Sequence, residues 1–147
     1  MTSVAALAAS RLTRNYTPSL PLGVYWLRRD LPVVRSELVD FAVPAPARDL
    51  IVDRYLPAGF RLLKRVVAVE GDTVCFVDGR YRVNGAVIST IAARDSQGRT
   101  LPLFRYCGPV PRGTAFVATP APSSLDSRYF GPVPLDALTV ARPLWIF

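Results

Sequence analysis

The stretch Thr73–Ile88, TVCFVDGRYRVNGAVI, contains the clearest local signal in this chain of 147 residues. Two dipeptides that favour tight hairpin turns, Asp78-Gly79 and Asn84-Gly85, separate three runs of β-branched, aromatic and apolar side chains. The pattern therefore predicts three short antiparallel strands that follow one another along the chain.

Further strands are predicted on both sides of this stretch. The runs that combine β-branched, aromatic and apolar residues are Gly23–Leu27, Glu37–Val43, Arg61–Val69, 115–119 and 138–147. Polar and apolar residues alternate in Glu37–Val43, so we expect this strand to be half-buried and to end at Pro44. Arg61–Val69 is apolar on both faces apart from two basic residues, which predicts a strand covered on both sides.

One internal helix is expected over Ala47–Tyr55, where the apolar spacing is helical and Pro57 and Gly59 follow. Fourteen prolines and nine glycines disfavour longer helices. Half of the residues are hydrophobic, and the length suits one well-buried core. The sequence therefore predicts a single, mostly-β domain of coiled antiparallel sheets with one short helix.

The charge of the chain favours a membrane surface over nucleic acid as a partner. Eighteen Lys and Arg residues against 11 Asp and Glu give a formal net charge of +7, which suits anionic lipids or nucleic acid. The basic residues are scattered without a zinc-finger or RNA-recognition signature, so nucleic acid is not expected. Tyr25, Trp26 and Trp145 are either core residues or anchors in the membrane interface.

Residues 1–12 form an N-terminal segment with one short apolar run, Val4–Ala9. A membrane-spanning helix needs about 20 apolar residues, so this run is too short to be one. Three interpretations stay open: a frayed terminus, a short helix, and the remnant of a membrane anchor. The folded domain is expected over residues 13–147.

Lys64 stands out because the chain contains no histidine and no other lysine. A serine nucleophile needs a base, and imidazole is not an option in this sequence. A lysine stripped of water has a lowered pKa and can accept the proton, whereas arginine stays protonated. An enzyme built on a serine nucleophile would therefore depend on Lys64.

Two other polar signals accompany this lysine. Ser19 lies in a proline-rich stretch, and the run Ser124–Arg128 follows a loop of small residues. Taken singly, each of the three signals can also be explained by a purely structural role. Ser19 would be a turn residue, Lys64 would pair with a carboxylate or extend to the end of its strand, and Asp126 would cap a helix or pair with Arg128 at a surface turn.

Five blocks of sequence carry a family resemblance when they are taken in order. They are Ser19–Tyr25, Leu63–Asp72, Val83–Gly85, Gly108–Val117 and Ser124–Gly131. In this order they resemble the type I signal peptidases and, within them, the TraF-type conjugal-transfer peptidases. The resemblance covers the chain from Asn15 to Phe147, and the S-x-P-x-G-x-Y form of the first block points to the TraF branch. It implies a signal-peptidase-like fold and a Ser/Lys dyad.

The resemblance implies a role for each matching side chain. Ser19 would be the nucleophile and Lys64 its general base. The backbone N–H of Ser19 and the hydroxyl of Thr17 would form the oxyanion hole. Ser124 would accept a hydrogen bond from the Lys64 amine and orient it.

The last block implies a buried ion pair between Asp126 and Arg128 that holds this loop, and it also places Asp126 among the catalytic residues. The chain departs from the larger signal peptidases just before this block. It has no large inserted β-domain, and TPAPSS replaces the G-D-N-R motif that precedes Ser124 in those enzymes.

The resemblance also implies a substrate and a location. A peptide would lie as an added strand between Thr13–Pro18 and Arg61–Leu63. The expected pocket for the residue before the cut is lined by Leu20, Leu22, Leu62 and Leu63. The substrate would be a pilin precursor or another exported protein, cleaved or cyclised at the periplasmic face of the bacterial inner membrane. No metal or cofactor is implied.

Cys75 and Cys107 are too few for a zinc site in a chain without histidine. The residues alone leave two buried thiols and one disulfide equally open. A domain that faces the oxidising periplasm, as the resemblance implies, favours the disulfide.

Three other functions compete with the TraF-type peptidase. The first is a general signal peptidase that acts on many preproteins. The second is a LexA-type self-cleaving domain, which is disfavoured because no DNA-binding helices precede Ser19. The third is a basic, β-rich interaction module of a secretion complex whose serine is inert. Such a module would tolerate Lys64→Arg, whereas a catalytic base would not.

Overall fold

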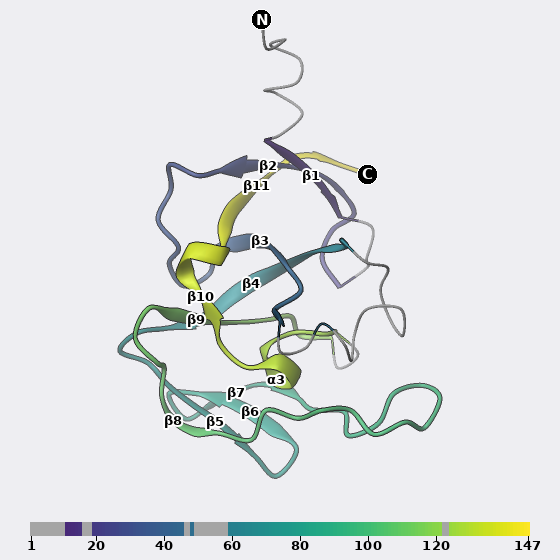
Figure 1. Ribbon diagram of the computed structural model, residues 1–147, viewed down its shortest axis with the longest axis vertical. Coiled ribbons are helices and arrows are strands. Elements are labelled where there is room, and N and C mark those ends of the chain that lie inside the picture. The colour runs from purple at the N-terminus through teal and green to yellow at the C-terminus, as the bar shows by residue number, and fades with distance from the viewer. Residues whose placement is uncertain (1–10, 16–18, 46–47, 49–58, 122–123) are drawn as a thin grey trace, which may run out of the picture.

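Seven strands form a curved antiparallel sheet in the order β1-β2-β11-β3-β4-β9-β10 (Figure 1). The computed structural model describes residues 11–15, 19–45, 48, 59–121 and 124–147. The strands of this sheet are β1 (Leu12–Asn15), β2 (Gly23–Arg28), β3 (Leu38–Ala42), β4 (Arg61–Val69), β9 (Thr114–Ala118), β10 (Val133–Pro134) and β11 (Thr139–Ile146). The sheet begins at Leu12, one residue before the predicted start of the domain.

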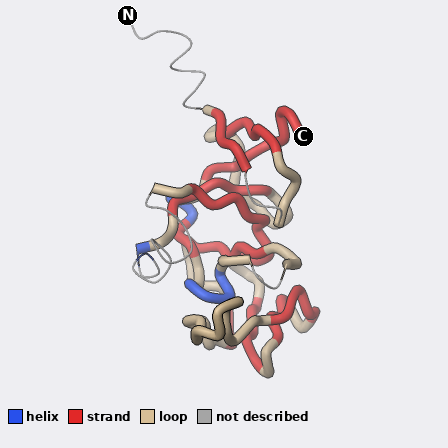
Figure 2. The backbone as a smooth tube through the Cα atoms, turned by 90° about the vertical axis from the view of Figure 1, so that its right-hand side faces the viewer, coloured by secondary structure: helices blue, strands red, loops and turns tan. Residues whose placement is uncertain are grey.

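A smaller sheet has the order β7-β6-β5-β8 and lies at the end of the molecule opposite β1 and β2 (Figures 1 and 2). Its strands are β5 (Thr73–Val77), β6 (Arg80–Val83), β7 (Ala86–Thr90) and β8 (Cys107–Pro109). Positive φ angles at both residues of each predicted turn, 55° and 68° at Asp78-Gly79 and 49° and 86° at Asn84-Gly85, confirm the two tight hairpins.

A disulfide joins Cys75 of β5 to Cys107 of β8, which lie opposite each other in the ladder. Of the two alternatives left open by the residues, the structure therefore contains the disulfide. The bond lies within the small sheet. It ties β8, which is part of the long connection between β7 and β9, to β5.

Buried side chains from both sheets form a common core. The residues between the sheets are Ala68, Val74, Phe76, Tyr81, Val83, Val110, Phe116 and Ala118. Two further clusters lie against the large sheet. The first includes Leu62 and Val66 of β4, and the second includes Leu63 of the same strand. Because β4 contributes to all three clusters, both of its faces are covered, as its apolar sequence predicted.

The predicted mostly-β class is confirmed, but the burial of β3 and the presence of β1 and β8 differ from the predictions. β3 is buried over Leu38–Phe41 rather than half-buried, because Asp40 is paired inside the protein and does not face solvent. The sequence patterns did not predict β1 or β8. The predicted helix Ala47–Tyr55 falls largely on residues outside the described part of the chain.

The short helix α3 (Ser127–Phe130) begins where the sequence offered only a cap or turn. Asp126 is its N-cap, and Gly131 at its C-terminal end has φ 80°, a conformation that suits glycine. A Cβ atom on Gly131 would also lie 2.8 Å from the ring of Phe104. Within the described residues, no helix is long and apolar enough to cross a bilayer.

Candidate active site

Lys64 lies in the middle of β4 and is only 4% exposed. It pairs with Val39 of β3, and it shares a strand face with Leu62 and Val66, two residues from it in either direction. Both neighbours belong to the cluster against which Leu125 and Phe130 pack. The lysine side chain therefore extends into a largely apolar region covered by the segment 124–130.

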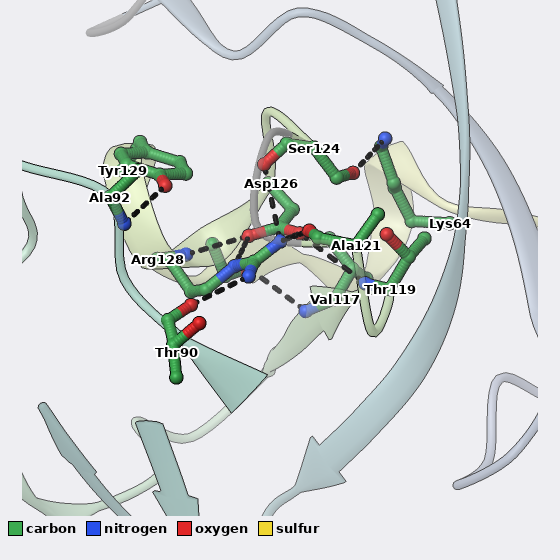
Figure 3. A network of polar contacts seen from close by, with 11 residues as sticks. Lys64, Thr90, Ala92, Val117, Thr119, Ala121, Ser124, Asp126, Arg128 and Tyr129 are labelled. Atoms are coloured by element: carbon green, nitrogen blue, oxygen red, sulfur yellow. Dashed lines mark hydrogen bonds and ion pairs between the residues drawn. The ribbon is translucent and has the colours of Figure 1, made fainter. Parts of the chain in front are cut away.

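The Lys64 amine is held by a serine 60 residues later in the chain. Lys64 Nζ donates a hydrogen bond of 2.6 Å to Ser124 Oγ (Figure 3). The pKa of Lys64 is lowered from 10.5 to about 8. Burial is the main cause, the carboxylate of Asp126 opposes it, and the positive charge of Arg128 adds to the lowering. A substantial fraction of the amine is therefore neutral near physiological pH and able to accept a proton.

Asp126 and Arg128 form a fully buried ion pair beside this lysine. Arg128 Nε donates to Asp126 Oδ1 at 2.8 Å, and Arg128 Nη2 donates to Asp126 Oδ2 at 2.7 Å. The backbone N–H of Thr119 also donates to Asp126 Oδ2, at 3.3 Å. Asp126 is thus placed to act on Lys64 through its electric field, and its predicted part in the chemistry remains a prediction.

Arg128 also fixes the loop that bears Ser124. Its guanidinium donates to the carbonyl oxygens of Ala121 at 2.7 Å, Ser124 at 3.2 Å and Thr90 at 2.9 Å (Figure 3). Ser127 Oγ accepts a hydrogen bond of 2.9 Å from the backbone N–H of Val117 and so ties α3 to β9. Because these contacts are buried, the Ser124 hydroxyl has a fixed position relative to β4.

Ser19 lies half-buried in the turn before β2. The next residue, Leu20, packs in the same buried cluster as Leu63, the residue before Lys64. The structure therefore brings the two segments that contain Ser19 and Lys64 together.

The residues that hold this turn are ones to which no sequence pattern pointed. Asn15 Nδ2 donates to the carbonyl oxygens of Leu20 and Pro21 at 3.0 and 3.1 Å, and Tyr25 Oη donates to that of Pro21 at 2.7 Å.

A model of the signal peptidase family, peptidase S26, matches residues 1–145. The chain belongs to the signal peptidase family. It is 34% identical to a plasmid transfer protein TraF from Escherichia coli over 98% of this chain and 87% of that protein. It is 38% identical to a conjugal transfer protein TraF from Agrobacterium fabrum over 90% of this chain and 81% of that protein. A signal peptidase I structure from Enterococcus faecalis is 24% identical, covers 78% of this chain and 98% of its own, and has a TM-score of 0.44.

The other residues that were predicted for the site do not lie together in this member of the signal peptidase family. Leu20 and Leu63 lie together in one cluster, whereas Leu62 faces the opposite side of β4 and Leu22 is 40% exposed. Thr17, the predicted oxyanion donor, lies outside the described residues. The four leucines therefore do not lie on a single buried surface.

Asp40 is a buried carboxylate in β3, a strand that was expected to be half-buried. Asp40 Oδ2 accepts a hydrogen bond of 3.0 Å from Thr13 Oγ1 of β1, and Asp40 Oδ1 accepts one of 2.8 Å from Arg61 Nε of β4. It therefore connects the two segments that were predicted to flank the substrate. The sequence gives no signal for this role, because a carboxylate that faces solvent has the same pattern of neighbours.

The described residues contain no group of three or more His, Cys, Asp or Glu side chains able to hold a metal ion. The groups available for chemistry are a hydroxyl, an amine, backbone N–H groups and the buried ion pair.

Proposed function

We propose that this chain is a serine endopeptidase with a Ser19/Lys64 dyad that matures a pilin precursor in a conjugative transfer system. The observation that supports this most strongly is the buried Lys64 amine, whose pKa is lowered to about 8 and whose position is fixed by Ser124. An inert interaction module has no need of a buried, bonded lysine, because burying a charge costs free energy.

In the first half of the proposed reaction, neutral Lys64 accepts the Ser19 hydroxyl proton while Ser19 Oγ attacks the carbonyl carbon of the scissile peptide. The oxyanion accepts hydrogen bonds from the Ser19 N–H and the Thr17 hydroxyl. The intermediate then collapses. The C–N bond breaks, the leaving amine takes the proton from Lys64, and an acyl-enzyme ester on Ser19 remains.

In the second half, a nucleophile resolves this ester with Lys64 again acting as base. Water gives a linear product with a new carboxylate. The N-terminal amine of the same substrate gives a new peptide bond and a cyclic product, which is lighter than the linear one by one water. Both outcomes use the same dyad, so the product distinguishes a hydrolase from a cyclase.

Two strand edges that no described strand covers support binding of the substrate as an extended peptide. Among the described strands, β1 pairs only with β2. The described pairing of β4 with β9 begins at Arg65, so no described strand pairs with that edge of Arg61–Leu63. Main-chain hydrogen bonds to such edges would supply affinity, and side-chain pockets would supply selectivity.

We also place the domain at the periplasmic face of the inner membrane. The C-terminal residues Trp145 and Phe147 are 69% and 62% exposed, and Trp26 is 41% exposed, whereas Tyr25 is in the core. Arg14 lies over the Phe147 ring and Arg28 over the Trp26 ring. Exposed aromatic rings beside arginines suit the boundary between acyl chains and anionic headgroups.

The relatives named for plasmid and conjugal transfer support a pilin precursor as the substrate. A general signal peptidase that acts on many preproteins is the second candidate, because the family whose model matches is described as signal peptidase. The two differ in their substrates and not in their dyad.

Incubation of the protein with a pilin precursor in detergent, followed by intact-mass measurement, tests the proposal. Ser19→Ala is the matched control. A cyclic product that appears only with the wild-type protein supports maturation by cyclisation, and a linear product supports hydrolysis. Cleavage of unrelated preproteins at the same rate would favour the general signal peptidase. Equal products from wild type and Ser19→Ala would overturn the proposal.

A further inference from the structure

Thr119, the residue after β9, has a buried hydroxyl that the proposed dyad does not use. The residue is 1% exposed, and its Oγ1 has no hydrogen-bond partner among the described residues. A buried hydroxyl without a partner costs free energy, and a valine of the same shape would avoid that cost. The position of this hydroxyl therefore calls for a functional explanation.

The sheet register places Thr119 next to the Lys64 side chain. Arg65 of β4 pairs with Ala118 of β9. Continued by one position beyond these last paired residues, the antiparallel register would bring Thr119 opposite Lys64, where the Cβ atoms of such a pair are about 4.5–5.5 Å apart. Figure 3 shows the Thr119 side chain beside the base of the Lys64 side chain. A lysine with four side-chain torsions can bring its amine to a hydroxyl at this distance.

Two other hydroxyls in the described residues are buried without a partner, those of Tyr81 and Ser89. They lie opposite each other on β6 and β7 in the small sheet. Of these three residues, Thr119 is the one that the continued register of β4 and β9 would bring opposite a lysine. The charge of that lysine changes during the proposed reaction.

The chemistry of an amine base gives this hydroxyl a use. A neutral amine has two N–H groups and one lone pair, and it becomes an ammonium with three N–H groups when it accepts a proton. In the structure Ser124 accepts one of these N–H groups. A buried ammonium needs acceptors for the others, because an unsatisfied charged donor is costly.

We infer that Thr119 is a second positioning residue for Lys64, whose hydroxyl accepts a hydrogen bond from the ammonium formed when Lys64 takes the Ser19 proton. The inference rests on the proposed function for its place in the reaction. The charged groups that act on this amine are Asp126 and Arg128 from the loop and α3, while β3 presents uncharged Val39 opposite it. Thr119 would add a neutral acceptor to these charges.

The chain offers a direct test because Lys64 is its only lysine. Protein labelled with ¹³C at the lysine ε carbon gives one lysine Cε signal in an NMR pH titration, and that signal reports the pKa of Lys64. The variants to compare with wild type are Thr119→Val, which keeps the shape and removes the hydroxyl, and Thr119→Ser, which keeps the hydroxyl. Thr119→Ala replaces Thr119→Val if the latter does not fold.

The inference predicts that Thr119→Val lowers the pKa of Lys64 by about one unit, because a hydrogen bond to a charged group favours the charged form. Thr119→Ser should retain the wild-type pKa. With an active substrate, the acid limb of the kcat/KM profile should move to lower pH in Thr119→Val alone, together with a lower plateau kcat. A merely structural threonine would change thermal stability and leave both titrations in place.

An unchanged or raised Lys64 pKa in the variant without the hydroxyl would overturn the inference. The NMR titration needs no substrate, so this result is independent of whether the protein cleaves a pilin precursor. Loss of the proposed function would instead appear as products that do not depend on Ser19.

Discussion

Ser124 Oγ lies 2.6 Å from Lys64 Nζ although 60 residues separate the two in the sequence. The contact joins strand β4 to the loop before α3, and the loop is itself fixed by the buried Asp126–Arg128 pair. The fold therefore holds the amine in one orientation within a region that also lowers its pKa. This combination of position and lowered pKa is what a lysine base requires.

Replacing Ser124 by alanine should lower kcat with little change in KM. The Lys64 amine would lose Ser124 Oγ, the acceptor that fixes its position. A small displacement of a catalytic group costs about 10²-fold in rate. Steady-state kinetics of Ser124→Ala and Ser124→Thr would measure this effect. Thr retains a hydroxyl, so it should recover part of the rate. A Ser124→Ala variant with wild-type kcat would show that this contact does not position the base.

The stability of the protein should depend on the charge of Lys64. The pKa of this lysine is about 8 when folded and 10.5 in its ordinary state, so the unfolded chain binds the extra proton between these two pH values. The free energy of unfolding should therefore rise as the pH increases from about 8 to 10.5, by up to about 3 kcal/mol. In the variant Lys64→Met, the free energy of unfolding should not show this rise.

Denaturant unfolding of both proteins across this pH range gives the comparison. The other titrating groups are shared, so the difference between wild type and Lys64→Met isolates the lysine. Parallel curves for the two proteins would mean that the pKa of Lys64 is not lowered in the folded state.

Arg128→Met should destabilise the fold strongly. It leaves the Asp126 carboxylate fully buried without its cation, which typically costs about 3–5 kcal/mol. Arg142→Met is a suitable control, because the Arg142 side chain is 50% exposed and its ion pair with Glu37 contributes about 1 kcal/mol at most. Equal losses in the two variants, measured by chemical denaturation, would contradict the structural role of the buried pair.

The disulfide should stabilise the protein without taking part in the chemistry. Cys75 and Cys107 are separated by 32 residues, and closing a loop of this length contributes about 3–4 kcal/mol in the chain-entropy description. Cys75→Ser/Cys107→Ser should therefore have a lower Tm and an unchanged kcat at temperatures where it remains folded. Free-thiol titration of the unreduced wild-type protein should detect no thiol, and two thiols per chain would exclude the bond.

Much of the fold could be predicted from local sequence. The hairpins at Asp78-Gly79 and Asn84-Gly85 follow from turn chemistry within a few residues, and β4 matches its predicted bounds because its apolar run is continuous. β1 and β8 were not predicted because they are short, and their pairing with β2 and β5 depends on tertiary contacts. Such contacts have no local signature.

The residues of the candidate site can also be divided into those that the sequence predicts and those that depend on tertiary contacts. Lys64 could be singled out because composition left no other base, and Ser124 followed from a family resemblance. Asp40 could not be recognised, because alternation with apolar neighbours is also typical of a residue that faces solvent. Its burial depends on Thr13 and Arg61, which lie 27 and 21 residues away in the sequence and supply the partners of its carboxylate.

Whether Lys64 is the base for Ser19 is tested most directly with the variant Lys64→Arg. The quantity to measure is the rate at which this variant cleaves a precursor that bears a signal peptide. Arginine retains the positive charge and much of the length of lysine, but it cannot become a neutral base. Lys64→Arg should be as inactive as Ser19→Ala, while circular dichroism should show that both variants remain folded. Cleavage by Lys64→Arg near the wild-type rate would contradict the dyad.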